Sequence, residues 1–197
     1  MKFKKLSVLF CSLLALTSVM AVSAAETETV SETEAASEEE STASGADEET
    51  EYPITIQHAY GETVIESKPE RIATVGWENQ DTPLALGIAP VGVSAANYGM
   101  VTENNLHPWT DEAFQELGVD APNVFDDVDG LDFEAISDCD PDVILASYSG
   151  LTQEDYDTLS QIAPVIPYKE NAWQTTWRDQ TIENAEGMGM KAEGEAK

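Results

Sequence analysis

Hydrophobic and polar positions follow two patterns along residues 52–197, and each pattern predicts a different kind of strand. In YPITIQHAYGETVIESKP, apolar and polar residues alternate on both sides of Tyr60-Gly61-Glu62. This alternation predicts a β-hairpin with Ile54 and Ile56 on the first strand and Val64 on the second. Four short apolar runs, RIATVGW, VGVSAAN, DVILAS and PVIPY, predict further strands. DVILAS has no polar alternation, which is typical of a strand buried on both faces.

Helix-like spacing separates these strands. NQDTPLALGIAP predicts a helix that stops at Gly87, and TDEAFQELG predicts one that is capped by Thr110 and ends at Gly118. LDFEAISDCDP predicts a short third helix, and TQEDYDTLSQIAP predicts a fourth that is capped by Thr152.

Strands that alternate with helices predict the α/β class, here a doubly wound, mostly parallel sheet flanked by helices. In such sheets the ligand binds in the crevice beyond the carboxyl ends of the strands. Residues that directly follow the predicted strands are therefore the candidate site residues.

Each of the four apolar strands is followed by an aromatic residue with polar neighbours. These residues are predicted to form one ligand-binding edge with an aromatic floor and a single cation. The predicted ligand-binding residues are Trp77, Glu78, Asn79, Tyr98, Tyr148, Ser149, Trp173, Trp177 and Arg178.

Two segments precede the predicted domain. Residues 1–25 have early lysines, an apolar run and small residues at the end, which predicts a secretory signal peptide rather than a membrane anchor. Residues 26–51 contain eleven acidic residues and no Lys or Arg, and this composition predicts a disordered acidic spacer. The folded lobe is predicted to span residues 52–175.

Charge and composition narrow the function further. Residues 52–197 contain 27 acidic and six basic residues, and this balance argues against nucleic acid or an anionic membrane as a partner. Loss of Cys11 with the signal peptide leaves Cys139 alone, so no internal disulfide is predicted.

Motifs for catalysis or metal binding are missing from the sequence. No glycine-rich phosphate loop and no Gly-x-Ser-x-Gly elbow occurs, and His58 and His107 lack the spacing of a zinc site. FDDVDGLD lacks the closing glutamate of a calcium loop, and it is interpreted as an acidic turn with a helix cap. We therefore expect a binding protein with no catalytic residues, no cofactor and no protein-bound metal, rather than an enzyme.

Four segments together carry a family resemblance: KPERIATVGWENQDTPLALGIAPVGVS, LDFEAISDCDPDVILASYSG, LSQIAPVIPY and GMGMKAEGEA. They resemble the N-terminal lobe of the iron–siderophore substrate-binding proteins of ABC importers, whose two lobes are joined by one long helix. The resemblance implies capture of a ferric siderophore outside the membrane, with Arg178 or Arg71 as a counter-charge. It also implies docking of a monomeric protein to an ABC permease.

The resemblance has further implications for individual positions. A carboxylate that docks to a permease arginine is expected early in the first helix, where Asp81 stands with Glu78 nearby. Ala24-Ala25-Glu26 offers no cysteine for lipid anchoring, so the protein is expected to be exported to the cell envelope without an evident lipid anchor.

Length is where the sequence departs from the family. Residues 176–197 are expected to begin the joining helix, and the second lobe is expected to be absent, through truncation of either the record or the gene. The alternatives left open are haem or cobalamin binding on the same fold, with Tyr98 or Tyr148 as a haem ligand. A single lobe without transport activity is also left open.

Overall fold

The computed structural model describes residues 50–197, so the predicted signal peptide and most of the acidic spacer lie outside the described residues. The strands are β1 (Ile54–His58), β2 (Gly61–Ile65), β3 (Ile72–Thr74), β4 (Gly92–Ser94), β5 (Val124–Phe125), β6 (Val143–Ala146) and β7 (Val165–Pro167). The helices are α1 (Asp81–Ala85), α2 (Pro108–Glu116), α3 (Phe133–Asp138), α4 (Gln153–Leu159), α5 (Trp177–Gly187) and α6 (Lys191–Glu195).

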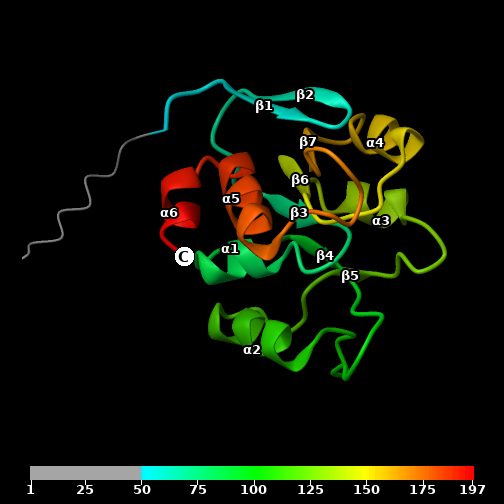
Figure 1. Ribbon diagram of the computed structural model, residues 1–197. Helices are drawn as coiled ribbons and strands as arrows, with labels where there is room; N and C mark the ends of the chain where they lie inside the picture. The colour runs from blue at the N-terminus through cyan, green and yellow to red at the C-terminus, as the bar shows by residue number, and fades with distance from the viewer. Residues whose placement is uncertain (1–49) are drawn as a thin grey trace, which may run out of the picture. The chain divides into compact units, whose positions relative to one another are not determined.

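A five-stranded parallel sheet forms the centre of this part of the chain, in the order β5-β4-β3-β6-β7 (Figure 1). The order reverses on either side of β3, because β4 and β5 extend the sheet in one direction and β6 and β7 in the other. This is the doubly wound arrangement, and the predicted fold class is confirmed. The crevice beyond the central strands is therefore the expected place for a ligand.

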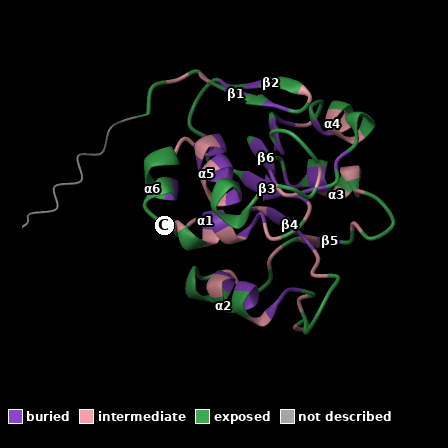
Figure 2. Cartoon of the chain, viewed as in Figure 1, coloured by how far each residue is buried: buried purple, intermediate pink, exposed green. Residues whose placement is uncertain are grey.

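The strand β6 shows why these runs have no polar alternation. All four of its residues are buried, because helices cover both faces of the sheet (Figure 2). Val143 and Leu145 pack toward α5, and Ile144 and Ala146 pack toward α3 and α4. Successive residues of a strand point to opposite faces, so both sets must be apolar.

The hairpin β1–β2 forms as predicted, but its inner face differs from the sequence expectation. Its two-residue turn pairs Ile54 with Ile65 and Ile56 with Thr63. This register turns Thr63 and Ile65 inward and leaves Val64 half-exposed. The buried Thr63 hydroxyl donates to the Val165 carbonyl at 2.7 Å, which ties the hairpin to the sheet at β7.

Two predicted helix boundaries, at Thr152 and Gly87, agree with the structure, and the one predicted at Thr110 differs. The Thr152 cap of α4 is confirmed as a capping box with Asp155, and Gly87 stops α1 with a φ of +78°. The predicted Thr110 cap is wrong, because α2 begins two residues earlier at Pro108 and buries Thr110 inside the helix. Proline is favoured at the first helical position, since its φ is already helical and it has no N–H to satisfy.

Two further differences concern short elements. The sequence predicted no strand at β5, whose two residues are too few for a periodic pattern. The helical segment predicted from residue 176 onward is divided, because α5 ends at Gly187 and α6 begins only at Lys191. Gly189 adopts a φ of +70° between them, a conformation that glycine accepts at little cost.

Helix α5 lies directly on the sheet because Gly187 has no side chain. A methyl group at this position would meet Ile166 Cγ1 at 2.6 Å and Leu145 Cδ2 at 3.0 Å. Within residues 50–197 no helix has the length and apolar character needed to span a membrane.

We predict that Gly187→Ala lowers the free energy of unfolding. Overpacking against Ile166 and Leu145 costs about 1–3 kcal/mol, which outweighs the roughly 1 kcal/mol that alanine gains in a helix. Urea unfolding monitored by circular dichroism measures the change. The control is Glu186→Ala, which removes only a 3.0 Å surface ion pair with Lys191 and should cost less than about 0.5 kcal/mol. Equal stability of the wild type and Gly187→Ala would contradict the close packing of α5.

Candidate functional site

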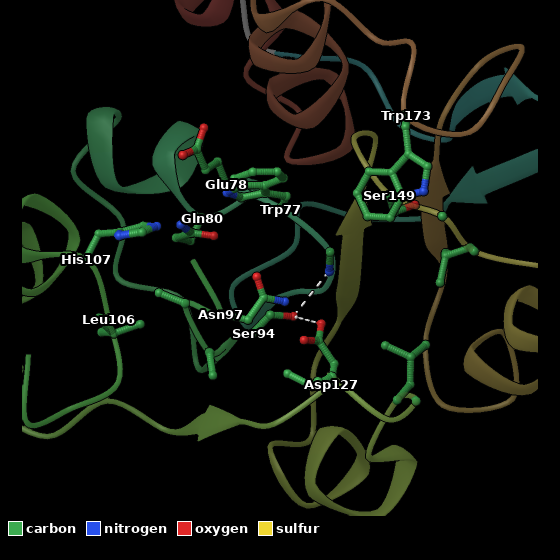
Figure 3. A pocket seen from close by; sticks show the side chains of 18 of the residues that line it. Trp77, Glu78, Gln80, Ser94, Asn97, Leu106, His107, Asp127, Ser149 and Trp173 are labelled. Atoms are coloured by element: carbon green, nitrogen blue, oxygen red, sulfur yellow. Dashed lines mark hydrogen bonds between the residues drawn. The ribbon is translucent and has the colours of Figure 1, made fainter. Parts of the chain in front are cut away.

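A cavity of about 430 Å³ lies at the carboxyl ends of β3, β4 and β6, where the topology places the crevice (Figure 3). Trp173 and His107 lie at opposite sides of it, with Ser94 and Asp127 between them. Its lining also includes Gly76, Trp77, Glu78, Gln80, Ala95, Ala96, Asn97, Leu106, Thr110, Val128, Gly130, Leu131, Ser149, Gly150, Leu151 and Asp155.

The end of β3 reaches the cavity through Gly76. This residue has a φ of +82°, and a side chain on it would meet the Tyr148 carbonyl oxygen and Ser149 Cβ at 2.8 Å. Only glycine allows the chain to pass this close to the end of β6. The Trp77 N–H then donates to the Tyr148 carbonyl at 3.0 Å, which places the indole at the cavity.

The end of β6 supports the second tryptophan in a similar way. A side chain on Gly150 would overlap the Trp173 ring at 2.5–2.7 Å, so the indole lies directly on the glycine backbone. Trp173 itself has a φ of +60°, and its N–H donates to the Ser149 carbonyl at 3.1 Å. The indole is thus held at the opening, where half of its surface stays exposed.

Beneath the cavity, Asn79 connects three segments that are distant in sequence. It is fully buried, and its side-chain N–H₂ donates to the carbonyls of Val75 at 2.8 Å and Tyr148 at 3.0 Å. Its Oδ1 accepts from Tyr148 N at 3.1 Å, Gln180 Nε2 at 3.2 Å and Asn184 Nδ2 at 3.0 Å. Because both ends of the amide are occupied by the protein, Asn79 lies under the floor and not in contact with the cavity.

The polar part of the cavity centres on Ser94 and Asp127. The Gly76 N–H donates to Ser94 Oγ at 3.2 Å, and Ser94 Oγ donates to Asp127 Oδ2 at 2.6 Å (Figure 3). The serine hydroxyl therefore orients the carboxylate, which comes from the loop after β5.

Asp81 is a perturbed acid at the start of α1, close to the cavity. Burial, together with the negative charge of Glu78, raises its pKa to about 6, while His107 and the Gln80 amide act in the opposite direction. A helix N-terminus normally favours a carboxylate, so desolvation is the larger effect here.

The cavity has an acidic lining. Its charged residues are Glu78, Asp127 and Asp155, and no Lys or Arg in residues 50–197 lines it. The two arginines expected as counter-charges, Arg71 and Arg178, do not line this cavity. Arg71 precedes β3, and it donates to the Asp140 carbonyl at the opposite end of the sheet. Arg178 lies on α5 over the Trp177 ring, at 4.2 Å from its centroid.

The structure brings only some of the predicted ligand-binding residues together. Trp77, Glu78, Ser149 and Trp173 line the cavity. Tyr98 and Tyr148 lie behind these tryptophans rather than in the lining, edge-on to Trp77 at 5.9 Å and to Trp173 at 5.4 Å between ring centroids. Three other predicted residues also lie outside the cavity lining: the buried Asn79, Trp177 and Arg178. Trp177 and Arg178 belong to the first turn of α5 and are exposed to solvent.

Other lining residues had no signal in the sequence. Leu106 and His107 come from the irregular segment that leads into α2, where no strand end was predicted, and Thr110 comes from the first turn of α2. The Asp127 loop was interpreted as an acidic turn, because the two-residue strand that positions it was not recognised. His107 is buried and lines the cavity.

Residues 50–197 contain no group of three or more His, Cys, Asp or Glu side chains arranged to hold a metal ion. The residues that line the cavity present indole faces, small polar groups and carboxylates. They can hold a partly apolar ligand by contact and hydrogen bonding.

Comparisons with known proteins match this geometry. The model of the family described as "Periplasmic binding protein" matches residues 72–197. The chain is 28% identical over 159 residues to YhfQ of Bacillus subtilis (strain 168), whose name assigns it provisionally to the ABC transporter substrate-binding lipoproteins. That match covers 80% of this chain and 46% of YhfQ.

Two solved structures resemble the described fold. PiaA from Streptococcus pneumoniae TIGR4, in complex with ferrichrome, is 55% identical with a TM-score of 0.70, and the match covers 73% of this chain and 47% of PiaA. Staphylococcus aureus SirA, complexed with staphyloferrin B, is 28% identical with a TM-score of 0.58, and the match covers 73% of this chain and 44% of SirA. The chain thus spans about half the length of the proteins it matches.

We predict that Asn79→Ala is strongly destabilising, because it removes the acceptor of four donors: Ser147 Oγ, Tyr148 N, Gln180 Nε2 and Asn184 Nδ2. Each unsatisfied group costs roughly 1–3 kcal/mol, so the free energy of unfolding should fall by about 3 kcal/mol or more. Urea unfolding measures the loss. Asn97→Ala is the matched control, since Asn97 is an exposed lining residue, and it should change stability by less than about 0.5 kcal/mol. A loss no larger than that of the control would disprove the role of Asn79.

We predict that Asp81→Asn stabilises the protein at pH 7.5 and has no effect near pH 3. Because the folded-state pKa of about 6 lies above the ordinary aspartate pKa of 3.8, the stability that Asp81 contributes is fully present below the unfolded-state pKa. This stabilising contribution is lost as the pH rises through the folded-state pKa of Asp81. After allowance for partial solvent screening, the gain at pH 7.5 should be about 1–2 kcal/mol. Chemical unfolding at both pH values tests the sign, and a loss of stability at pH 7.5 would contradict it.

Proposed function

From the premise that this chain belongs to the periplasmic binding protein family, we propose that it captures a ferric siderophore outside the cytoplasmic membrane and delivers it to an ABC importer. The observation that carries the proposal is the cavity beyond β3, β4 and β6, bordered by Trp77 and Trp173. The family and the matched proteins are substrate-binding proteins rather than enzymes, which supports a role in binding.

The size and surface of the cavity suit a bulky chelate. About 430 Å³ lies within the range of cavities that hold ligands of several hundred daltons. Trp77 is 41% exposed and Trp173 is 50% exposed, so both indoles retain apolar surface that a ligand can cover. A siderophore encloses its iron, and the proposal therefore needs no metal ligand from the protein.

The ferrichrome complex of PiaA points to one ligand class. Ferrichrome is a ferric hydroxamate without net charge, and the acidic lining would not repel it as it would repel a ferric tris-catecholate. We therefore place ferric hydroxamates first among the siderophores that this lobe would bind.

Delivery to an importer needs a surface that a permease can recognise. Asp81 and Glu78 remain the proposed docking carboxylates, because Asp81 begins α1, Glu78 lies three residues before it, and both keep part of their surface exposed. An arginine of the permease would pair with either one and would relieve their mutual repulsion.

We predict that ferrichrome quenches the tryptophan fluorescence of the purified protein. Trp77→Ala and Trp173→Ala should each weaken binding about tenfold, because covering an indole contributes roughly 1–2 kcal/mol. Titration of the emission with ferrichrome measures both effects. Trp177→Ala is the matched control, since Trp177 lies outside the cavity lining, and it should change affinity less than about twofold.

Haem, cobalamin, a ferric catecholate and ferric citrate serve as comparison ligands in the same titration. Quenching by haem or cobalamin alone would replace the siderophore proposal with that ligand. No response to any ferric chelate would rule out siderophore binding by this protein.

A further inference from the structure

The charged side chains that line the cavity are all acidic, and this favours some ferric chelates over others according to their charge. Three carboxylates line it, and within residues 50–197 no Lys or Arg does. Asp155 uses one oxygen in the capping box with Thr152, where it accepts at 2.9 Å and 2.7 Å. Glu78 and Asp127 are the lining carboxylates that take no part in a helix cap.

Asp127 is the better oriented of these two. Ser94 Oγ accepts from Gly76 N, so its single proton is directed to Asp127 Oδ2 at 2.6 Å. The second oxygen, Oδ1, has no hydrogen-bond partner within the described part of the chain. A carboxylate fixed through one oxygen presents the other as an acceptor of defined direction.

An independent observation also indicates unused hydrogen-bonding capacity in this cavity. Thr110 lines the same cavity and is only 1% exposed, yet its Oγ1 has no partner among the described residues. Buried hydroxyls normally have a partner, and one without is expected where a ligand or a water completes the site.

We propose that Asp127 is the receptor for a protonated amine carried by the ferric chelate. The inference rests on the proposed siderophore function and names the charge class of the ligand. An ammonium group supplies the positive charge that the described lining lacks, and its N–H donors match the free Asp127 Oδ1. The same carboxylates repel chelates that carry a net negative charge.

The test compares two chelates that differ only at an amine. Ferrioxamine B carries a terminal ammonium group, and N-acetylation converts it to a neutral amide with the iron site unchanged. Titration of tryptophan fluorescence should show that the wild-type protein binds ferrioxamine B at least about fivefold more tightly than its N-acetyl derivative.

Asp127→Asn should reduce the affinity for ferrioxamine B about tenfold and that for the N-acetyl derivative less than about twofold. Asparagine still accepts from Ser94, so the fold should persist, and circular dichroism checks this. Asp129→Asn is the matched control, because it makes the same charge change in the same loop at an exposed residue outside the lining. It should leave the ratio of the two affinities unchanged.

Each other outcome is decisive. Equal binding of both chelates, with equal losses in Asp127→Asn, would overturn the amine proposal and leave the siderophore function intact. If Asp129→Asn changed the affinity ratio as much as Asp127→Asn does, the proposal would also be overturned. The effect would then come from the total negative charge of the loop and not from a contact with Asp127. Pentylamine bound as tightly as ferrioxamine B would show an amine site unrelated to iron. Binding of neither chelate, nor of ferrichrome, would reject the proposed function itself.

Discussion

The site depends on one buried amide. Asn79 follows β3, and its side chain holds the end of β6 and two residues of α5 through hydrogen bonds at both its oxygen and its nitrogen. These segments are separated by about 70–105 residues in sequence, and the polar groups that they bring together are buried or partly buried. Because burial makes an unpaired amide costly, the network admits only one arrangement of the three segments. Trp77 and Tyr148, which adjoin it in sequence or by hydrogen bond, take their positions from that arrangement.

The cavity combines apolar contact with an acidic field, and the two act on different properties of a ligand. Indole surfaces such as those of Trp77 and Trp173 contribute favourable binding free energy to any ligand that covers them, largely without regard to its charge. Carboxylates without counter-ions discriminate strongly by charge, and the strength grows as water is displaced. In such a lobe the indoles supply contact area, and the carboxylates supply selectivity for the charge of the ligand. The acidic character of the whole domain adds to the same preference at longer range.

The sequence predicted the sheet, its buried strands and most helices, because period-two and helical patterns reflect burial directly. DVILAS reads as a strand covered on both faces, and β6 is one. Of the residues that line the cavity, it predicted Trp77, Glu78, Ser149 and Trp173, which lie in the segments that follow β3, β6 and β7. It could not predict Leu106, His107 or Asp127, since irregular segments and a two-residue strand have no periodicity. Asn79 illustrates the opposite error: a polar residue at a strand end was assigned to the ligand, although tertiary hydrogen bonds occupy it fully. Arg178 was misplaced because α5 turns its first residues away from the crevice.

The contact between Gly150 and Trp173 has a consequence for the thermodynamics of binding. An indole that already rests against backbone, at a residue with a φ of +60°, has few side-chain rotamers left to lose. A mobile aromatic side chain loses conformational entropy when a ligand binds, and this loss offsets part of the contact energy. Trp173 loses little conformational entropy. The free energy of binding at this edge should therefore reflect mainly the displaced water and the covered apolar surface, with a negative heat-capacity change as its signature.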